Sequence, residues 1–559
     1  MVRRVFNFMY REVRGLHQAA YILALFAIGS QLLALVRDRL LANLFGAGPE
    51  LDLYYAAFRI PDLMYVLFAS VLSVYVLLPF VSRYTEEGGG SKAGADVISQ
   101  VFTLFLILFS VASLVLIVTA KFYVGALFPG FADQTELLIS LIQILLLQSF
   151  LLGISSLCGV VTQISHRFVL YAISPLLYNV SIIFGVVTLY PLYGLKGLVV
   201  GVVIGALLHL AVQLPFVFKS EYRFKVTSVI NWTLIKEVCL VSIPRALTLS
   251  LNQIVLLVLV GMASTMSAGS VSVFQFAFNL QSVPLAVIGM SYSVAAFPTL
   301  STLLAKKMHV EFNHQLLTAL RHIIFWSVPI AALIIVLRAQ IVRVLLGSGS
   351  FDWSDTRLTA AALALFVISL IAQSVLLLLI RAFYAGGKTF TPLWVALVSS
   401  VASVFLALFF HATYATNEAF QNSIASIFRL EGVSGIEILM LTLAFVCGQF
   451  IQLIILMTVS VKAFCISYRP LVRLLAEASA AALAGGFSAY AALVFVVDGV
   501  NQDTFIGITL QGLVAGVMGL IAVILVYRVC KAPELFEIYR SFHSKVFKTD
   551  VIAPQPDVL

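Results

Sequence analysis

The stretch LVRDRLLANLFGAGPELDLYYAAFRIPDLMY runs from Leu35 to Tyr65 and decides how this chain is interpreted. It carries seven charged residues, namely Arg37, Asp38, Arg39, Glu50, Asp52, Arg59 and Asp62. The chain around it is 61% hydrophobic and only 11% charged, whereas soluble domains carry about 25% charged residues. Because a charge is costly inside a membrane, charges within such an apolar chain need a structural or functional reason.

Apolar runs of about 20 residues recur from one end of the chain to the other, and each is long enough to cross a bilayer as a helix. They lack the alternating pattern of a membrane β-barrel. The sequence therefore predicts an all-α polytopic membrane protein with about fourteen spans. The expected spans are 17–36, 52–80, 97–126, 135–162, 168–190, 195–218, 240–263, 271–300, 316–345, 358–384, 390–412, 436–463, 472–496 and 505–528.

The distribution of basic residues predicts the orientation. With an even number of spans both termini share one side, and 25 of the 34 Lys and Arg residues fall on that side. The positive-inside rule then places both termini in the cytoplasm, with segments 1–16 and 529–559 outside the membrane. The basic residues are scattered over many short loops, which argues against a nucleic-acid surface. The first apolar run is predicted to be an uncleaved helix rather than a signal peptide.

The sequence offers little for catalysis. The loops near 219–239 and 413–435 are too short for a sizeable soluble domain. The GKT in YAGGKTF (384–390) lies between two membrane helices and lacks the first glycine of a phosphate-binding loop. The histidines and the five cysteines lack metal-ligand spacing. We expect no enzyme activity, no metal and no cofactor.

An internal similarity suggests how the spans are organised. AFRIPDLMYVLFASVLSVYVLLPFVS (57–82) and AFNLQSVPLAVIGMSYSVAAFPTLS (277–301) both begin with Ala-Phe and end with Pro-x-x-Ser. If this is a true repeat rather than a chance likeness of apolar helices, spans 1–6 and 7–12 form parallel repeats, as in many transporters. The predicted parts are a first lobe (17–218), a linker (219–239), a second lobe (240–463) and two further helices (472–528).

The charges of the second span have a geometric pattern. Arg59 follows Asp52 by seven residues, which places both on one helical face, and Asp62 is one turn beyond Arg59. Pro61 interrupts the helical hydrogen bonds and predicts a bend. We expect this face to line a central cavity that binds an anionic substrate. The alternative is that the charges are paired anchors near the outer interface.

The stretch LVRDRLLANLFGAGPELDLYYAAFRIPDL resembles the N-terminal signature of the MurJ/MviN family of lipid II flippases. Further segments resemble that family in order: FPGFAD (128–133), HRF (166–168), SPLLYNVSII (174–183), LLGSGSFDWSDTRLTAAAL (345–363) and RAFYAGGKTFTP (381–392). The resemblance implies a V-shaped pair of six-helix lobes, with two C-terminal helices forming a groove for a polyprenyl tail. The implied substrate is lipid II, an undecaprenyl-diphosphate-linked disaccharide-pentapeptide used for peptidoglycan synthesis in the cell wall.

The resemblance also implies a substrate site. Arg37, Asp52 and Arg59 match residues of the family's central cavity, and Pro61 matches as well. The family usually has charged residues where this chain has Gln31, Met64, Ser70 and Asn279. The expected cavity residues are Ser30, Gln31, Arg37, Arg39, Asp52, Arg59, Asp62 and Asn279, with further hydrogen bonds from Asn252, Gln253 and Gln275.

Several functions stay open at this point. The main expectation is a monomeric lipid II flippase that works by alternating access in the bacterial cytoplasmic membrane, in contact with membrane lipids. The alternatives are a flippase for another polyprenyl-linked saccharide, a non-transporting scaffold of the cell envelope, or a cation-driven exporter of small molecules. Coupling to a cation or to the membrane potential is not decided by the sequence.

Overall fold

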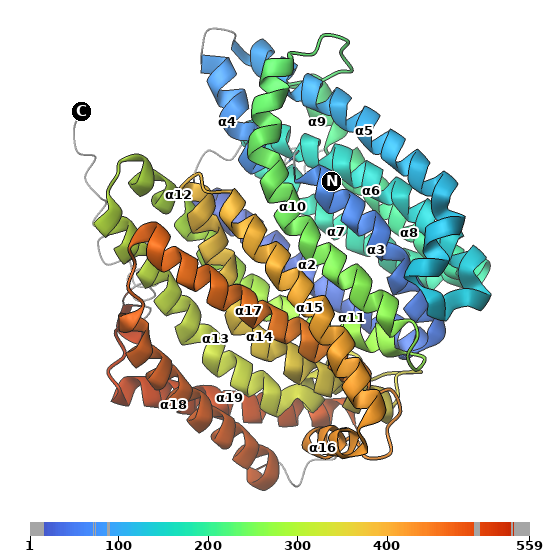
Figure 1. Ribbon diagram of the computed structural model, residues 1–559, viewed down its shortest axis with the longest axis vertical. Coiled ribbons are helices and arrows are strands. Elements are labelled where there is room, and N and C mark those ends of the chain that lie inside the picture. The colour runs from blue at the N-terminus through green and yellow to red at the C-terminus, as the bar shows by residue number, and fades with distance from the viewer. Residues whose placement is uncertain are drawn as a thin grey trace, which may run out of the picture. The chain divides into compact units, whose positions relative to one another are not determined.

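The computed structural model describes residues 16–70, 72, 74–86, 90–496, 504–537 and 540. These residues are almost entirely helical, and no β-strand occurs in this part of the chain (Figure 1). The prediction of an all-α fold is confirmed. The helices in chain order are α2 (Leu16–Phe45), α3 (Pro49–Ala69), α4 (Val74–Tyr84), α5 (Gly90–Leu127), η2 (Pro129–Gln134), α6 (Thr135–Ile164), α7 (Phe168–Phe184), η3 (Gly185–Leu189), α8 (Tyr190–Ala211), α9 (Leu214–Lys219), α10 (Trp232–Ala263), α11 (Ser270–Leu285), η4 (Ala286–Met290), α12 (Ser291–Ala305), α13 (His309–Leu345), α14 (Trp353–Ala385), α15 (Phe390–Thr416), α16 (Glu418–Phe428), α17 (Ile438–Phe464), α18 (Arg469–Ala491), η5 (Ala492–Val496) and α19 (Phe505–Val529).

Eleven helical stretches in the described part of the chain are long and apolar enough to cross a membrane. One of them, Phe168–Lys219, has 52 residues and covers two predicted spans. Helices α2 and α3 are not among the eleven, and α3 holds four charged residues within its 21. The protein is thus a multi-pass membrane protein. The helices are consistent with the predicted fourteen spans.

The described helices fall into two compact units. The first unit comprises Met1–Phe276, Leu345–Ala362 and Thr389–Gly448, and the second comprises Ala277–Val344, Leu363–Lys388 and Gln449–Leu559. The division passes through helices α11, α14 and α17, so these units differ from the lobes predicted from the repeat. The lobe boundaries at 218 and 240 stay a prediction.

The predicted second span, 52–80, contains a break between two helices. Helix α3 ends at Ala69 and α4 begins at Val74. At the break the Ser70 hydroxyl donates a hydrogen bond to the Leu67 carbonyl (3.1 Å), and such local bonds compete with helix propagation. The eighth predicted span, 271–300, is helical throughout but contains the π-helical turn η4. Pro284 stands just before this turn and cannot donate a helical hydrogen bond, which favours an irregular turn there.

The connection at 190–196 forms a hairpin in the first unit that lets α8 turn back along α7, and it depends on glycines. Gly194 has φ +60° within the hairpin, and α8 then packs closely along α7 and η3. Gly197, Gly201 and Gly205 repeat every four residues on one face of α8. A Cβ atom on Gly201 would lie 2.5 Å from the Gly185 Cα. Small residues at this spacing let membrane helices pack backbone against backbone.

Candidate functional site

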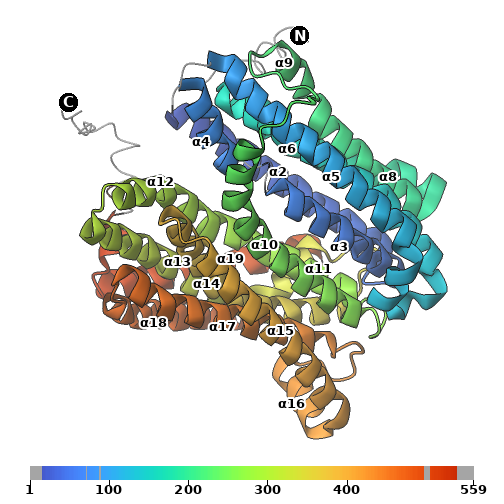
Figure 2. The ribbon, with the colours of Figure 1, turned by 45° about the horizontal axis from the view of Figure 1, so that its top comes forward.

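Helix α3 carries the charges of the second span and begins as its sequence predicts. Gly48 occupies the N-cap position, Pro49 follows it, and the first turn contains Glu50 and Asp52. Proline at the first position and acidic residues in the first turn both favour a helix start. Helix α3 packs against α6 and α10 in the first unit (Figure 2). This packing buries side chains that would otherwise lie on a membrane-exposed helix.

Asp52 is buried, with 4% of its surface exposed, and caps the start of α11. Its Oδ2 accepts a hydrogen bond from the Gly269 amide (2.7 Å), and its Oδ1 accepts from the Ser272 amide (2.7 Å) and hydroxyl (2.6 Å). Gly269 stands at the N-cap position of α11 and has no side chain that could accept these bonds. Asp52 therefore supplies from α3 the carboxylate that a helix N-terminus favours.

Gly269 itself is required by the close approach of two loops. Its φ is +90°, and a Cβ atom there would lie 2.1 Å from the Ala47 carbonyl oxygen. Only glycine adopts such a conformation without strain. The loop before α3 and the loop before α11 therefore touch through their backbones, next to the Asp52 cap.

Arg59 is also buried, with 6% of its surface exposed. Its guanidinium donates a hydrogen bond to the side-chain oxygen of Gln275, on α11. Its Nε is a buried nitrogen with no hydrogen-bond partner among the described residues. Since Asp52 and Arg59 both bind to the beginning of α11, the prediction that they share one face of α3 is confirmed.

Pro61 and Asp62 follow Arg59 on α3, within one helical turn of it. Asp62 is half-buried on the same helix, at the spacing where opposite charges interact. Helix α3 continues through Pro61, whose carbonyl accepts a hydrogen bond from the Ser149 hydroxyl of α6 (2.9 Å). This bond attaches α6 to α3 near the proline. The bend expected at Pro61 stays a prediction.

Arg37 lies near the end of α2 in a second polar cluster. It forms an ion pair with its neighbour Asp38 (2.8 Å), and its Nη1 donates to the Asn179 side-chain oxygen on α7 (3.2 Å). The Asn179 amide in turn donates to the Ser30 hydroxyl (3.2 Å) and to the Pro175 carbonyl (3.1 Å). These bonds hold the guanidinium between α2 and α7, with 21% of the Arg37 side chain still exposed.

The other predicted site residues are distributed over three helices. Gln31 and Arg39 are half-buried on α2, beside Ser30 and Arg37 respectively. Asn279 is half-buried on α11, one turn after Gln275, in the second unit. On α10, Asn252 is exposed and Gln253 half-buried. The structure thus joins Ser30 to the Arg37 cluster through Asn179 and joins Gln275 to Arg59.

Three residues of these clusters were not predicted. Asn179 lies within SPLLYNVSII, and a buried asparagine in an apolar helix is a signal that could have identified it. Gly269 and Ser272 gave no such signal, because their partner Asp52 is more than 200 residues away in the chain.

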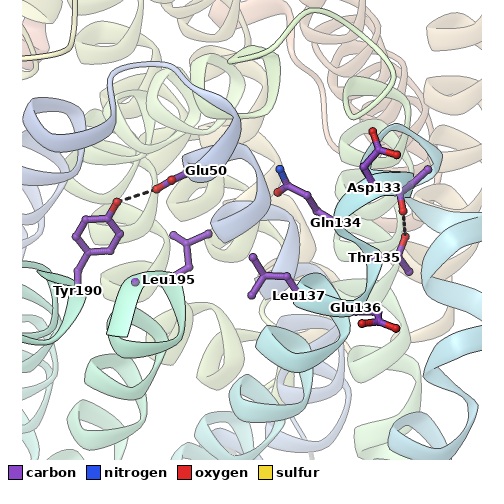
Figure 3. Close-up of a pocket in the computed structure, with 10 residues that line it drawn as sticks. Glu50, Asp133, Gln134, Thr135, Glu136, Leu137, Tyr190 and Leu195 are labelled. Carbon is purple, nitrogen blue, oxygen red and sulfur yellow. Dashed lines mark hydrogen bonds between the residues drawn. The ribbon is translucent and has the colours of Figure 1, made fainter. Parts of the chain in front are cut away.

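A cavity of about 670 Å³ lies elsewhere in the first unit (Figure 3). Glu50, Asp133 and Glu136 contribute carboxylates to it, and the Tyr190 hydroxyl donates to Glu50 (2.8 Å). The remaining lining residues are Ala132, Gln134, Thr135, Leu137, Gly194 and Leu195. None of these residues belongs to the predicted site. The carboxylates would repel an anionic headgroup, so this cavity does not provide the expected substrate site.

In the described part of the chain, no group of three or more His, Cys, Asp or Glu side chains could hold a metal ion. The helices and their apolar surfaces define a multi-pass membrane protein, and the family to which the chain belongs makes it a transporter. The chain belongs to the MurJ family: the model described as "Lipid II flippase MurJ" matches residues 41–506.

Individual relatives and solved structures agree with this family. The "Probable lipid II flippase MurJ" of Buchnera aphidicola is 27% identical over 462 residues, which is 77% of this chain and 89% of that protein. The "Lipid II flippase MurJ" of Burkholderia cenocepacia is 26% identical over 422 residues, covering 71% and 80% respectively.

The same fold occurs in solved structures. A structure of lipid II flippase MurJ in an inward closed conformation matches with a TM-score of 0.70 and 22% identity, covering 91% of this chain and 99% of that one. An inward-facing multidrug resistance MATE family transporter of the MOP superfamily has a TM-score of 0.61 and 15% identity, covering 78% and 94%. At these identities the two matches establish the fold.

Proposed function

We propose that this chain moves lipid II from the cytoplasmic to the outer leaflet of a bacterial cytoplasmic membrane by alternating access. Membership of the MurJ family supports the substrate. The observation that carries the proposal is the pair of arginines, Arg37 and Arg59, held within the first unit of a membrane-spanning fold. A diphosphate cannot cross hydrocarbon unaided, and guanidinium groups bind phosphate oxygens in a bidentate manner.

The side chains that bind Arg37 and Arg59 in this structure could be replaced by a diphosphate. Gln275 and Asn179 accept their hydrogen bonds through neutral amide oxygens. A phosphate oxygen is the stronger acceptor for a guanidinium because it carries negative charge, which an amide oxygen lacks, and because two such oxygens can bind in a bidentate manner. A diphosphate that reached Arg59 would displace Gln275 and could also use the unpartnered Nε. The Asp38 ion pair would keep Arg37 oriented during the exchange.

The remaining predicted residues have different proposed roles. Ser30, Gln31, Arg39, Asp62 and Asn279 are proposed as further contacts of the headgroup or its sugars. Asp52 is proposed to hold α11 rather than to bind substrate, because three hydrogen bonds already occupy its carboxylate. Both termini are proposed to lie in the cytoplasm, with the protein acting as a monomer among membrane lipids.

Complementation tests the function. The chain would be expressed in bacteria depleted of their own lipid II flippase, and labelled lipid II would be followed to the outer leaflet. We expect rescue by the parent chain and its loss in Arg37→Ala. Arg83→Ala is the matched control, because Arg83 is 46% exposed, pairs with the exposed Glu237 and lies outside the predicted site.

Two other outcomes would reject the proposal. If well-expressed parent chain gave no rescue and Asn279→Arg restored none, another polyprenyl-linked saccharide or a scaffold role would replace lipid II transport. Rescue that Arg37→Ala leaves intact would show that the Arg37 cluster does not handle the diphosphate.

A further inference from the structure

A short helix outside the predicted spans has an apolar face that is exposed at one edge. Helix α16 (Glu418–Phe428) lies in the segment predicted as an extramembrane loop, and a single residue, Asn417, separates it from the end of α15 (Figure 1). The Asn417 side chain caps α16 by accepting a hydrogen bond from the Phe420 amide (3.0 Å). No residue of α16 is buried.

The residues of α16 separate into two faces. Phe420, Ile424, Ile427 and Phe428 recur at the spacing of one helical stripe. Ile427 is 68% exposed, whereas Phe420, Ile424 and Phe428 are half-buried, so the protein covers part of this stripe and leaves Ile427 at its open edge. The opposite face carries Glu418, Asn422 and Ser426 at successive turns. The exposed polar face suits contact with water, and the exposed apolar edge at Ile427 suits contact with an apolar medium.

The connection to α15 places α16 at a membrane surface. Helix α15 is one of the stretches that can cross the membrane, and its last residue is Thr416. The turn at Asn417 is held by a hydrogen bond from the Gln421 side chain to the Tyr414 carbonyl (2.6 Å). Because only Asn417 separates the two helices, α16 must begin at the membrane-surface end of α15. Its 11 residues extend about 16 Å from that point.

The segment after α16 is anchored as well. Arg429 ends the helix with a left-handed conformation (φ 56°), and Leu430 is fully buried. The Arg429 carbonyl accepts a hydrogen bond from Arg357, in the first turn or two of α14. Farther on, the Glu437 carboxylate accepts from the Ser267 amide (3.0 Å) and hydroxyl (2.6 Å). Both ends of α16 are therefore fixed to the same end of the first unit.

We propose that α16 is an interfacial helix, with Ile427, the exposed edge of its apolar stripe, inserted among the lipids where α15 leaves the membrane. The proposed topology makes this the outer leaflet. The helix has no Lys or Arg, so its contact is with acyl chains and does not depend on anionic headgroups. This inference goes beyond the proposed function and holds for any substrate, because it rests on the spanning helix and on α16 alone.

Depth measurements in proteoliposomes test the proposal. Ile427→Cys and Asn422→Cys would each be labelled with an environment-sensitive fluorophore. The parent chain, treated in the same way, measures the background signal from its own five cysteines. We expect strong quenching at position 427, and little at 422, by lipids that carry a spin label near the headgroup end of the acyl chain. For iodide, a quencher dissolved in water, we expect strong quenching at position 422 and little at position 427.

Several results would overturn it. Equal iodide quenching at both positions in proteoliposomes of the purified chain would show that the stripe is in water. A label at 427 that is protected only in native membranes would indicate a protein partner instead of lipid. These measurements need no lipid II, so they succeed or fail independently of the transport assay.

Sidedness is tested with the same variants. In intact spheroplasts, a membrane-impermeant maleimide should label Asn422→Cys from outside, relative to the parent chain. Labelling that occurs only after permeabilisation would place α16 at the cytoplasmic surface and reject the outer-leaflet assignment.

A further variant tests the lipid contact itself. Ile427→Asp should retain expression, but a probe placed on Ile424→Cys in this variant should lose its contact with lipid. Unchanged quenching there would contradict an inserted stripe.

Discussion

Asp52 on α3 caps the start of α11 by accepting hydrogen bonds from Ser272, a residue 220 positions later in the chain. One carboxylate oxygen accepts both the amide and the hydroxyl hydrogen of Ser272, at 2.7 and 2.6 Å. The other oxygen accepts the Gly269 amide hydrogen. This arrangement connects α3, which carries Arg59, to α11, which carries the arginine's partner Gln275.

Removing this cap should destabilise the first unit. Asp52→Ala deletes three hydrogen bonds and leaves buried amides of α11 unpaired, which costs about 1–3 kcal/mol of unfolding free energy. Ser272→Ala deletes only the hydroxyl bond and should cost about 1 kcal/mol. Thermal unfolding in detergent measures both. Equal effects of the two substitutions would show that the carboxylate's other bonds contribute nothing.

Asn179 should matter for transport although it was not predicted. Asn179→Ala removes the acceptor that holds Arg37 and the donor to Ser30. Hydrogen bonds to charged groups contribute about 1.5–3 kcal/mol, so we expect about a tenfold or larger loss of lipid II flipping. Ser30→Ala should lose less, since the Asn179–Arg37 bond remains. The complementation assay measures both, and a normal rate in Asn179→Ala would contradict the assigned orientation of Arg37.

The glycine contact between α7 and α8 predicts a sharp steric effect. In Gly201→Ala the added methyl would lie 2.5 Å from the Gly185 backbone, which forces the helices apart at a cost of about 1–3 kcal/mol. Gly125→Ala is the matched control, because no atom lies within 4 Å of its added methyl. Thermal unfolding of the purified variants should separate them. A Gly201→Ala protein as stable as the control would argue against the close packing.

A buried ion pair should hold the segment that follows α19 in the second unit. Arg321 donates to Glu534 at 2.6 Å, and the Glu534 side chain is only 3% exposed. Glu534→Ala should loosen this segment locally and raise the rate of trypsin cleavage after the exposed Lys531. Glu537→Ala, which removes the exposed pair with His322, should change cleavage little. Equal trypsin rates in both variants would show that the Glu534 pair does not retain the segment.

The sequence predicted local features better than long-range ones. It correctly predicted an all-α membrane fold and a shared face for Asp52 and Arg59, since apolar length and helical spacing are local properties. It missed the end of α3 at Ala69, because an apolar run does not reveal that Ser70 turns back to bond Leu67. It also missed Ser272 and Gly269, because nothing near Asp52 in the chain indicates partners more than 200 residues away.

The separation between Asp52 and its partners has a consequence for biosynthesis. Gly269 and Ser272 follow Asp52 by 217 and 220 residues, and Gln275 follows Arg59 by 216. At ribosomal rates of roughly 5–20 residues per second, α11 is made about 10–40 s after α3. During that interval the nascent chain holds two charged side chains without their final partners, and such charges are costly in hydrocarbon. The cost of these two charges in α3 is therefore relieved by their final partners only once α11 has been made.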